Sequence, residues 1–337
     1  MSGGVVSVFR NEEEGRLRAP WRLAVHGVLL VACTFGAWLV LSVPFAVIGR
    51  IQPGPPAEMD GAFIPWSTVV PWVLAALVGS VLSTWLAAHW IDDRRFRDLG
   101  MRMNSAWWAD LGFGLALGIA AVAAVVVFEV RAGWAEITRI GPVQGGMVPF
   151  LIELAIAAII FSSIGFYEEL VARGYQTTNL AEGFNFPPLG RRGAAFVALV
   201  LTSLAFGLLH GTNPGSTALG VANIALSGLL PLGLPYVLTG RLGLSVGLHI
   251  SWNFAHSFIF GLPVSGAMLG SHSLMVTDVI GPEMWTGGAF GPEGGLLGTL
   301  AIMAECAVAL LWIRLREGKL TIREDIADPP GQPGGEA

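Results

Sequence analysis

The polar residues of this chain that are able to do chemistry lie inside an apolar stretch. Residues 148–263 carry eight formal charges, and three of them, Glu168, Glu169 and Arg173, fall within the short segment 165–173. An ionised side chain in the middle of a bilayer costs about 2.5 to 3.5 kcal/mol, so these three need partners or water. On a helix Glu169 and Arg173 form an i, i+4 ion pair. Glu168 points about 100° away from that pair and stays available.

Two further polar sets occur later in the chain on apolar segments. His210 ends the run 206–210, and His249 and Asn253 are four residues apart, which places them on one face of a helix. A charged helix end or a single buried histidine often has only a structural role. Ionisable residues inside membrane segments are nevertheless functional hypotheses by default, because lipid makes them costly.

Together these residue types suit the hydrolysis of an amide. The reaction needs an activated water, a proton for the leaving amine and donors aimed at the developing oxyanion. A carboxylate in a cavity of low dielectric suits the base, and His210 is able to shuttle the proton. His249 and Asn253, one helical turn apart, are both able to face a single oxygen.

The order of the three polar sets resembles a known family. The chain is similar, over residues 168–253, to the CPBP family, the group of CAAX proteases and bacteriocin-processing proteins that is also called the abortive-infection family. The resemblance rests on three complete motifs on successive apolar segments: Glu168-Glu169-x-x-x-Arg173, Phe206-x-x-x-His210 and His249-x-x-x-Asn253.

This resemblance implies an intramembrane endopeptidase and assigns a role to each motif residue. It implies that Glu168 is the general base that activates water, with His210 assisting. His249 and Asn253 are then expected to stabilise the oxyanion, and the adjoining glutamate–arginine pair to hold the geometry of the site. The implied partner is a membrane-embedded or membrane-associated peptide or protein substrate, which in the eukaryotic members is prenylated.

A zinc site is the alternative use of the same residues. Glu168, His210 and His249 supply three ligands of the kind found around catalytic zinc, with one position left open. The His-Glu-x-x-His motif is absent, and Asn253, a poor zinc ligand, stands where a second histidine is expected. The sequence therefore favours a glutamate mechanism without a cofactor, and Zn²⁺ remains the alternative.

The elements that must position these residues are membrane helices. Only 13% of the 337 residues are charged, 53% are hydrophobic, and the mean hydropathy is +0.65, whereas soluble domains are about a quarter charged. The net charge of −5 shows no long run of one sign, which argues against nucleic acid as a partner. Apolar runs of about 20 residues predict eight spans, at 21–48, 66–90, 111–130, 150–166, 193–210, 216–238, 242–262 and 294–315.

These spans predict an all-α polytopic membrane protein with about eight transmembrane helices and a polar intramembrane cavity. Lys and Arg alternate between rich and poor connections, so both termini are expected in the cytoplasm of a bacterial cell with the protein in its cell membrane. The predicted organisation is a cytoplasmic tail (1–20), three peripheral helices (21–147), a catalytic core (148–262), an external Gly/Pro-rich loop (263–293), a last helix (294–316) and a cytoplasmic tail with a disordered end (317–337).

The simple span boundaries conflict with the proposed site. If the fourth span ended at Phe166 and the fifth began at Arg192, Glu168 and His210 would lie about 27 Å apart in depth. A fourth helix over 155–179 and a fifth over 194–216 bring both residues toward the middle of the bilayer. The sequence then predicts that the charged motif lines a buried polar cavity.

A transporter or binding protein is the competing function. In that interpretation Glu168 and His210 form a proton relay that is coupled to a small anion or amphiphile. Arg50, Glu129 and Glu153 would then also face the pathway.

Overall fold

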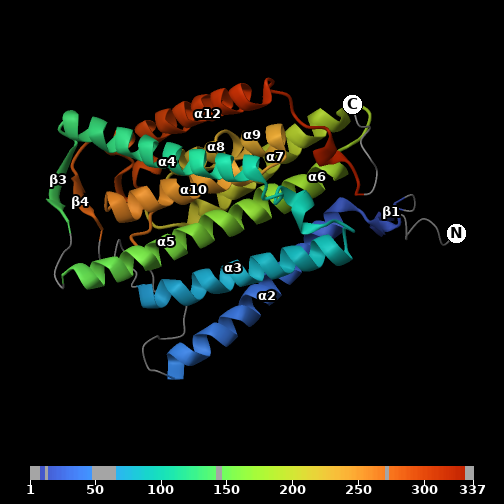
Figure 1. Ribbon diagram of the computed structural model, residues 1–337, viewed down its shortest axis with the longest axis horizontal. Helices are drawn as coiled ribbons and strands as arrows, with labels where there is room; N and C mark the ends of the chain where they lie inside the picture. Colours follow the sequence, from blue (N-terminus) through green and yellow to red (C-terminus); the bar gives the residue numbers. More distant parts are fainter. Residues whose placement is uncertain (1–7, 12–13, 48–65, 142–145, 270–272, 331–337) are drawn as a thin grey trace.

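The protein is a bundle of long helices that run alongside one another (Figure 1). This computed structural model describes residues 8–11, 14–47, 66–141, 146–269 and 273–330. The long helices are α2 (Ala19–Val47), α3 (Trp66–Trp90), α4 (Ser105–Arg131), α5 (Met147–Glu169), α7 (Gly190–Leu209) and α12 (Leu296–Glu317). Shorter helices complete the bundle: α6 (Thr178–Gly183), α8 (Ala218–Leu229), α9 (Gly233–Thr239), α10 (Gly243–Phe254) and α11 (Glu283–Thr286).

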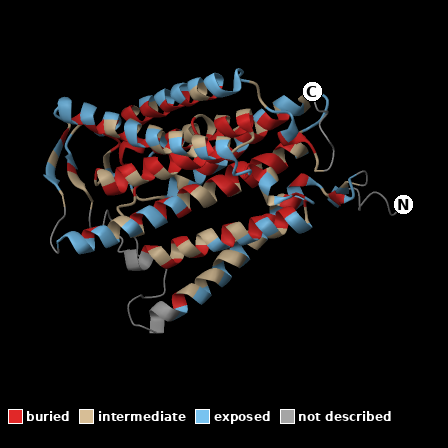
Figure 2. Ribbon diagram, viewed as in Figure 1, coloured by how far each residue is buried: buried red, intermediate tan, exposed pale blue. Residues whose placement is uncertain are grey.

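The helices have the character of membrane spans. Within the described residues, seven helical segments are long and apolar enough to cross a membrane. Their outward faces are apolar, as Val28, Val31 and Phe35 on α2 illustrate, and such a surface fits lipid better than water. Buried residues gather toward the middle of the bundle and exposed ones along its outer helices (Figure 2). The predicted all-α polytopic class is confirmed.

The predicted span at 242–262 accounts for the difference between eight expected spans and seven found. It forms the 12-residue helix α10, which a five-residue π-helix, η4 (Ala255–Ile259), extends. Ten residues of α10 are buried, which the sequence did not predict. The reason is that α10 lies among the other helices, with α4 and α5 packed directly against it.

Glycines let α4 and α5 approach α10 closely. A Cβ on Gly247 of α10 would lie 2.3 Å from the Leu111 carbonyl oxygen of α4, and one on Gly114 of α4 would lie 2.5 Å from the Leu244 carbonyl oxygen. On α5, a Cβ on Gly165 would lie 2.9 Å from the backbone nitrogen of Ile250. Small residues at such crossings are typical of helix packing in membranes, and here they fix the position of the helix that carries two motif residues.

The fourth span continues well beyond its first predicted end at Phe166. After α5 the chain enters a π-helix, η2 (Leu170–Thr177), and then α6, so the helical path runs from Met147 to Gly183. The motif glutamates are the last two residues of α5 and therefore lie inside this path. This agrees with the redrawn fourth helix over 155–179. The redrawn fifth helix over 194–216 begins and ends too late, because α7 starts at Gly190 and ends at Leu209.

The Gly/Pro-rich segment 263–293 is more regular than the predicted external loop. It contains β4 (Met275–Val279), which pairs antiparallel with β3 (Ala135–Ile140), and the 3-10 turns η5 (Gly288–Phe290) and η6 (Pro292–Gly294). Residues 270–272 of this segment lie outside the described part. Gly266, at φ +82°, approaches the backbone so closely that a Cβ would overlap the Pro214 carbonyl. This segment is therefore folded back onto the helices.

The first and last described segments of the chain lie at the same end of the bundle, and the β3–β4 pair lies at the opposite end (Figure 1). The N-terminal segment forms a small pair of strands, β1 (Arg10–Asn11) and β2 (Arg16–Leu17). The connection between α3 and α4 contains η1 (Phe96–Leu99), and the described part of the C-terminal tail contains η7 (Asp325–Ala327), where Ile326 and Ala327 are buried. The predicted disordered end at 331–337 lies outside the described residues, as does Arg50.

Candidate active site

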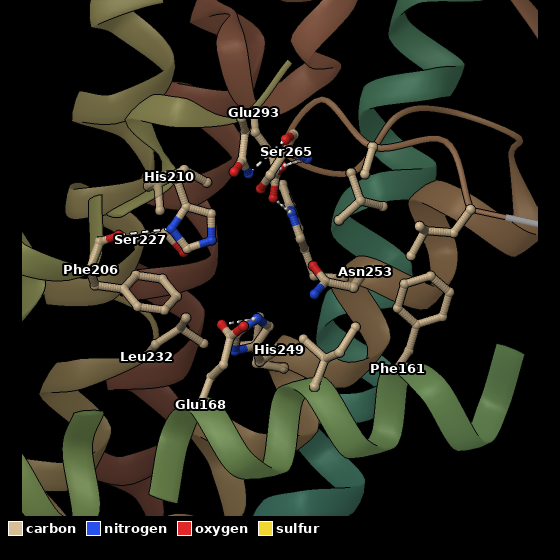
Figure 3. A pocket seen from close by; sticks show the side chains of 18 of the residues that line it. Phe161, Glu168, Phe206, His210, Ser227, Leu232, His249, Asn253, Ser265 and Glu293 are labelled. Atoms are coloured by element: carbon tan, nitrogen blue, oxygen red, sulfur yellow. Dashed lines mark hydrogen bonds and ion pairs between the residues drawn. The ribbon is translucent and has the colours of Figure 1, made fainter. Parts of the chain in front are cut away.

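A polar cavity of about 140 Å³ lies inside the bundle. Figure 3 shows the side chains around it, with Glu168 and His249 on one side and Glu293 and Ser265 across the open space. Four of the six predicted site residues line this cavity: Glu168, His210, His249 and Asn253. They come from α5, the end of α7, and α10. The structure therefore brings together side chains that are as much as 85 positions apart in the chain.

The two adjacent glutamates at the end of α5 have different surroundings. Glu168 lines the cavity and keeps 23% of its side chain exposed. Glu169 is fully buried behind the cavity wall and forms an ion pair with Arg173, at 3.0 Å between Oε1 and Nη1. The predicted i, i+4 pair is thus present. One carboxylate is reachable from the cavity, and the other is held by an internal partner.

Arg173 is fully buried and does not line the cavity. Its guanidinium carbon lies 4.5 Å from the centroid of the Phe206 ring, an arrangement in which the cation faces the aromatic ring. The absence of a side chain on Gly228 leaves room for the guanidinium, because a Cβ there would lie 2.6 Å from Arg173 Nη2. Arg173 therefore connects the first motif to the phenylalanine of the second motif.

His249 lies between both carboxylates. Its Nδ1 donates to Glu169 Oε1 at 2.8 Å, since an ionised carboxylate accepts hydrogen bonds only. Its Nε2 lies 3.7 Å from Glu168 Oε2. Glu169 thereby fixes the orientation of the imidazole, and Nε2 is the ring nitrogen that faces Glu168 and the cavity.

His210 lies at the start of the 3-10 turn η3 (His210–Thr212), immediately after α7. Its Nδ1 donates to the Phe206 carbonyl oxygen at 2.8 Å, which holds the ring against the last turn of α7. Nε2 is the ring nitrogen that this bond leaves for the cavity. Asn253 is buried on α10, one turn beyond His249, and lines the same cavity.

Several residues around the cavity were not singled out from the sequence, among them Asn213, Trp252, Ser265, Glu293 and Glu305. Glu305 lies within the last span, where the cost of a carboxylate in lipid is a signal that was available. The positions of Ser265 and Glu293 follow from the fold of segment 263–293 over the cavity, for which the sequence offers no local signal.

Of the residues assigned to a transport pathway, Glu168 and His210 line the cavity, and Arg50 lies outside the described residues. Glu129 is buried on α4 and Glu153 lies on α5, and neither lines the cavity.

Among the described residues, no group of three or more His, Cys, Asp or Glu side chains is arranged to hold a metal ion. Cys33 and Cys306 are free thiols.

Comparison with known proteins gives one match. Residues 149–255 match the family described as type II CAAX prenyl endopeptidase Rce1-like. The match includes all three motifs and confirms the resemblance drawn from them. No curated protein and no solved structure matches the chain.

Proposed function

We propose, on the premise that residues 149–255 belong to the Rce1-like type II CAAX prenyl endopeptidase family, that the protein is an intramembrane endopeptidase. It hydrolyses a peptide bond in a membrane-associated peptide or protein, with or without a lipid anchor. The observation that carries this proposal is the convergence of Glu168, His210, His249 and Asn253 on one cavity inside the bundle.

In the proposed reaction Glu168 takes a proton from a water molecule, and the resulting hydroxide attacks the carbonyl carbon of the scissile bond. The exposure of Glu168 to the cavity supports this role, because a general base must reach the water that it activates. The proton is then delivered to the nitrogen of the leaving amine, with His210 as the shuttle. The products are a new carboxylate and a new amine.

His249 and Asn253 stabilise the negative charge that forms on the carbonyl oxygen. Support comes from the hydrogen bond between His249 Nδ1 and Glu169, which fixes the ring. When both ring nitrogens carry a proton, Nε2 donates toward the cavity. The Asn253 side-chain amide supplies a second donor one turn away. Fixed donors in a site of low dielectric are worth about 2.7 to 4 kcal/mol each in transition-state stabilisation.

Glu169 and Arg173 act as positioning residues. They do not line the cavity, and their role is to hold the His249 ring and the surrounding helices in place. This division agrees with the buried ion pair and with the contact between Arg173 and Phe206.

The proposal is tested by comparing membrane-associated peptides from cells that carry the wild type or Glu168→Ala. We expect shortened products in wild-type cells and their full-length precursors in cells with Glu168→Ala. The purified wild type should cut those precursors in detergent. Indistinguishable peptide sets together with a changed uptake of a small solute would show that the protein is a transporter and not a protease.

A further inference from the structure

The wall of the cavity opposite Glu168 carries two more carboxyl groups. Glu293 belongs to η6, and Glu305 belongs to α12, so both come from the part of the chain that follows the family match. Figure 3 shows Glu293 across the cavity from Glu168. Neither carboxyl is required by the proposed mechanism.

Glu293 is held in place by three hydrogen bonds. Its Oε1 accepts from Trp252 Nε1 at 2.8 Å, and its Oε2 accepts from the backbone nitrogen and the hydroxyl of Ser265 at 2.5 and 2.8 Å. This is the pattern of an ionised carboxylate, which only accepts and has about four acceptor positions on its two oxygens. One position therefore remains for a further donor, and it belongs to Oε1.

The hydrogen bonds around Glu293 fix the covering segment as well. Ser265 has a left-handed backbone, with φ +47°, and Asn213 donates to its carbonyl oxygen at 2.9 Å. Asn223 donates to the carbonyl oxygen of Glu293 at 2.9 Å. The Glu293 carboxylate is thus held at the cavity by contacts from α10, from the loop after α7 and from α8.

Glu305 provides an independent observation. Only 3% of this residue is exposed, it lines the same cavity, and its Oε1 has no hydrogen-bond partner among the described residues. Buried carboxyl oxygens are almost always paired. The Glu305 carboxyl therefore has capacity for a further hydrogen bond at the edge of the cavity.

None of the described residues that line the cavity is Lys or Arg, and the buried Arg173 is directed at Glu169 and Phe206. The basic side chains in the lining are His210 and His249, on the Glu168 side, whereas the three donors to Glu293 are all uncharged groups. The potential beside the Glu293 carboxylate is therefore negative. At low dielectric it attracts a cation and repels a second anion strongly.

We propose that Glu293 and Glu305 form a specificity subsite for a positively charged group of the substrate, close to the scissile bond. This inference rests on the proposed endopeptidase function. A Lys or Arg side chain of the bound peptide fits the subsite, because it brings several donors to the open position on Glu293 and to the neighbouring Glu305 carboxyl.

The test measures cleavage by the purified full-length protein in detergent. The substrates are short apolar peptides, amidated at the C-terminus, that carry a single Lys, Gln or Glu at each position in turn, and mass spectrometry locates each cut. We expect at least one position near the bond where the Lys peptide is cut about tenfold faster than the Glu peptide, with Gln between them.

Two variants separate charge from structure. Glu293→Gln removes the charge while it retains the shape, and the preference for Lys over Gln should fall toward equality, with the Gln peptide still cut. Ser265→Ala retains the carboxylate and removes one of its donors, and it should preserve the preference. Glu305→Gln removes the second carboxyl group, and it gives a further measurement of the preference if Glu293→Gln does not fold.

Each outcome decides the question. If the wild type cuts Lys, Gln and Glu peptides at equal rates, the subsite is disproved while the endopeptidase stands. The subsite is also disproved if Glu293→Gln and Glu305→Gln both leave the preference for Lys unchanged. The same holds if Ser265→Ala loses as much of this preference as Glu293→Gln does. If no peptide is cut at all, the proposed function fails, and the inference fails with it.

Discussion

At the scale of single residues, the two neighbouring glutamates of α5 have different surroundings. Successive residues on a helix point about 100° apart, so Glu168 reaches the cavity while Glu169 lies in the interior against Arg173 and His249. We therefore propose a role in the reaction for Glu168 and a positioning role for Glu169.

This difference predicts that mutation of Glu168 lowers activity, whereas mutation of Glu169 also lowers stability. Glu168→Gln should leave thermal stability in detergent near that of the wild type and lower peptidase activity by about 10² to 10⁴. Glu169→Gln leaves Arg173 buried without its counter-charge, so the free energy of unfolding should fall by about 3 to 5 kcal/mol. Parallel melting curves and activity measurements on both variants check this. Equal losses of stability would contradict the assignment.

Single residues also distinguish a glutamate mechanism from a zinc mechanism. We predict that activity in detergent survives strong chelation, because the proposed base, shuttle and oxyanion donors are all side chains. The measurement is peptidase activity before and after treatment with a chelator, with metal content determined on the same sample. One equivalent of zinc, with activity lost on its removal and restored on its return, would replace this mechanism with a metal-dependent one.

At the scale of elements, the site depends on how closely α10 approaches α4 and α5. Backbone contact at Gly114, Gly165 and Gly247 brings α10 near enough for His249 to touch both glutamates of α5. The π-helix η2 directly follows those glutamates, and π-type turns are frequent at functional sites because they reorient the side chains around them.

A glycine substitution tests the importance of this approach. Gly247→Ala places a methyl group 2.3 Å from the Leu111 carbonyl oxygen, so α4 and α10 must separate, and both stability and activity should fall. Overpacking of this kind costs about 1 to 3 kcal/mol. Gly112→Ala on α4 is the matched control, because nothing lies within 4 Å of its Cβ position. If the two variants behave alike, the close packing is not required.

At the scale of the whole molecule, one end of the bundle gathers arginines from several separate segments. There Glu182 of α6 forms ion pairs with Arg16, Arg22 and Arg94, which come from the N-terminal segment, α2 and the loop after α3. These contacts fasten the peripheral helices to the part of the chain that carries the motifs. The β3–β4 pair occupies the opposite end (Figure 1).

The positive-inside rule predicts that the arginine-rich end faces the cytoplasm. The test uses a chain without Cys33 and Cys306 that carries one new cysteine, either Glu136→Cys in β3 or Lys319→Cys after α12. In intact cells a thiol reagent that does not cross membranes should label the cysteine at 136, and it should label the one at 319 only after permeabilisation. The reverse pattern would mean that the termini lie outside.

Local features of this protein could be predicted from its sequence. The spans follow from apolar runs, and the Glu169–Arg173 pair follows from a four-residue spacing, because both depend on interactions within a segment. The motif order indicated the family, and the need to bring Glu168 and His210 to one depth indicated that the fourth helix continues past Phe166. These inferences required no knowledge of which helices are neighbours.

Tertiary structure alone decided how these segments meet. The burial of α10, the contact of His249 with both glutamates, and the return of segment 263–293 that places Ser265 and Glu293 at the cavity all depend on packing between residues far apart in the chain. In lipid, helix packing is governed by shape and by small residues and not by a hydrophobic pattern, so a sequence that is apolar on all faces does not disclose its neighbours. The sequence by itself therefore determined that this is a membrane protein and predicted a reactive glutamate, and the fold determined what surrounds that glutamate.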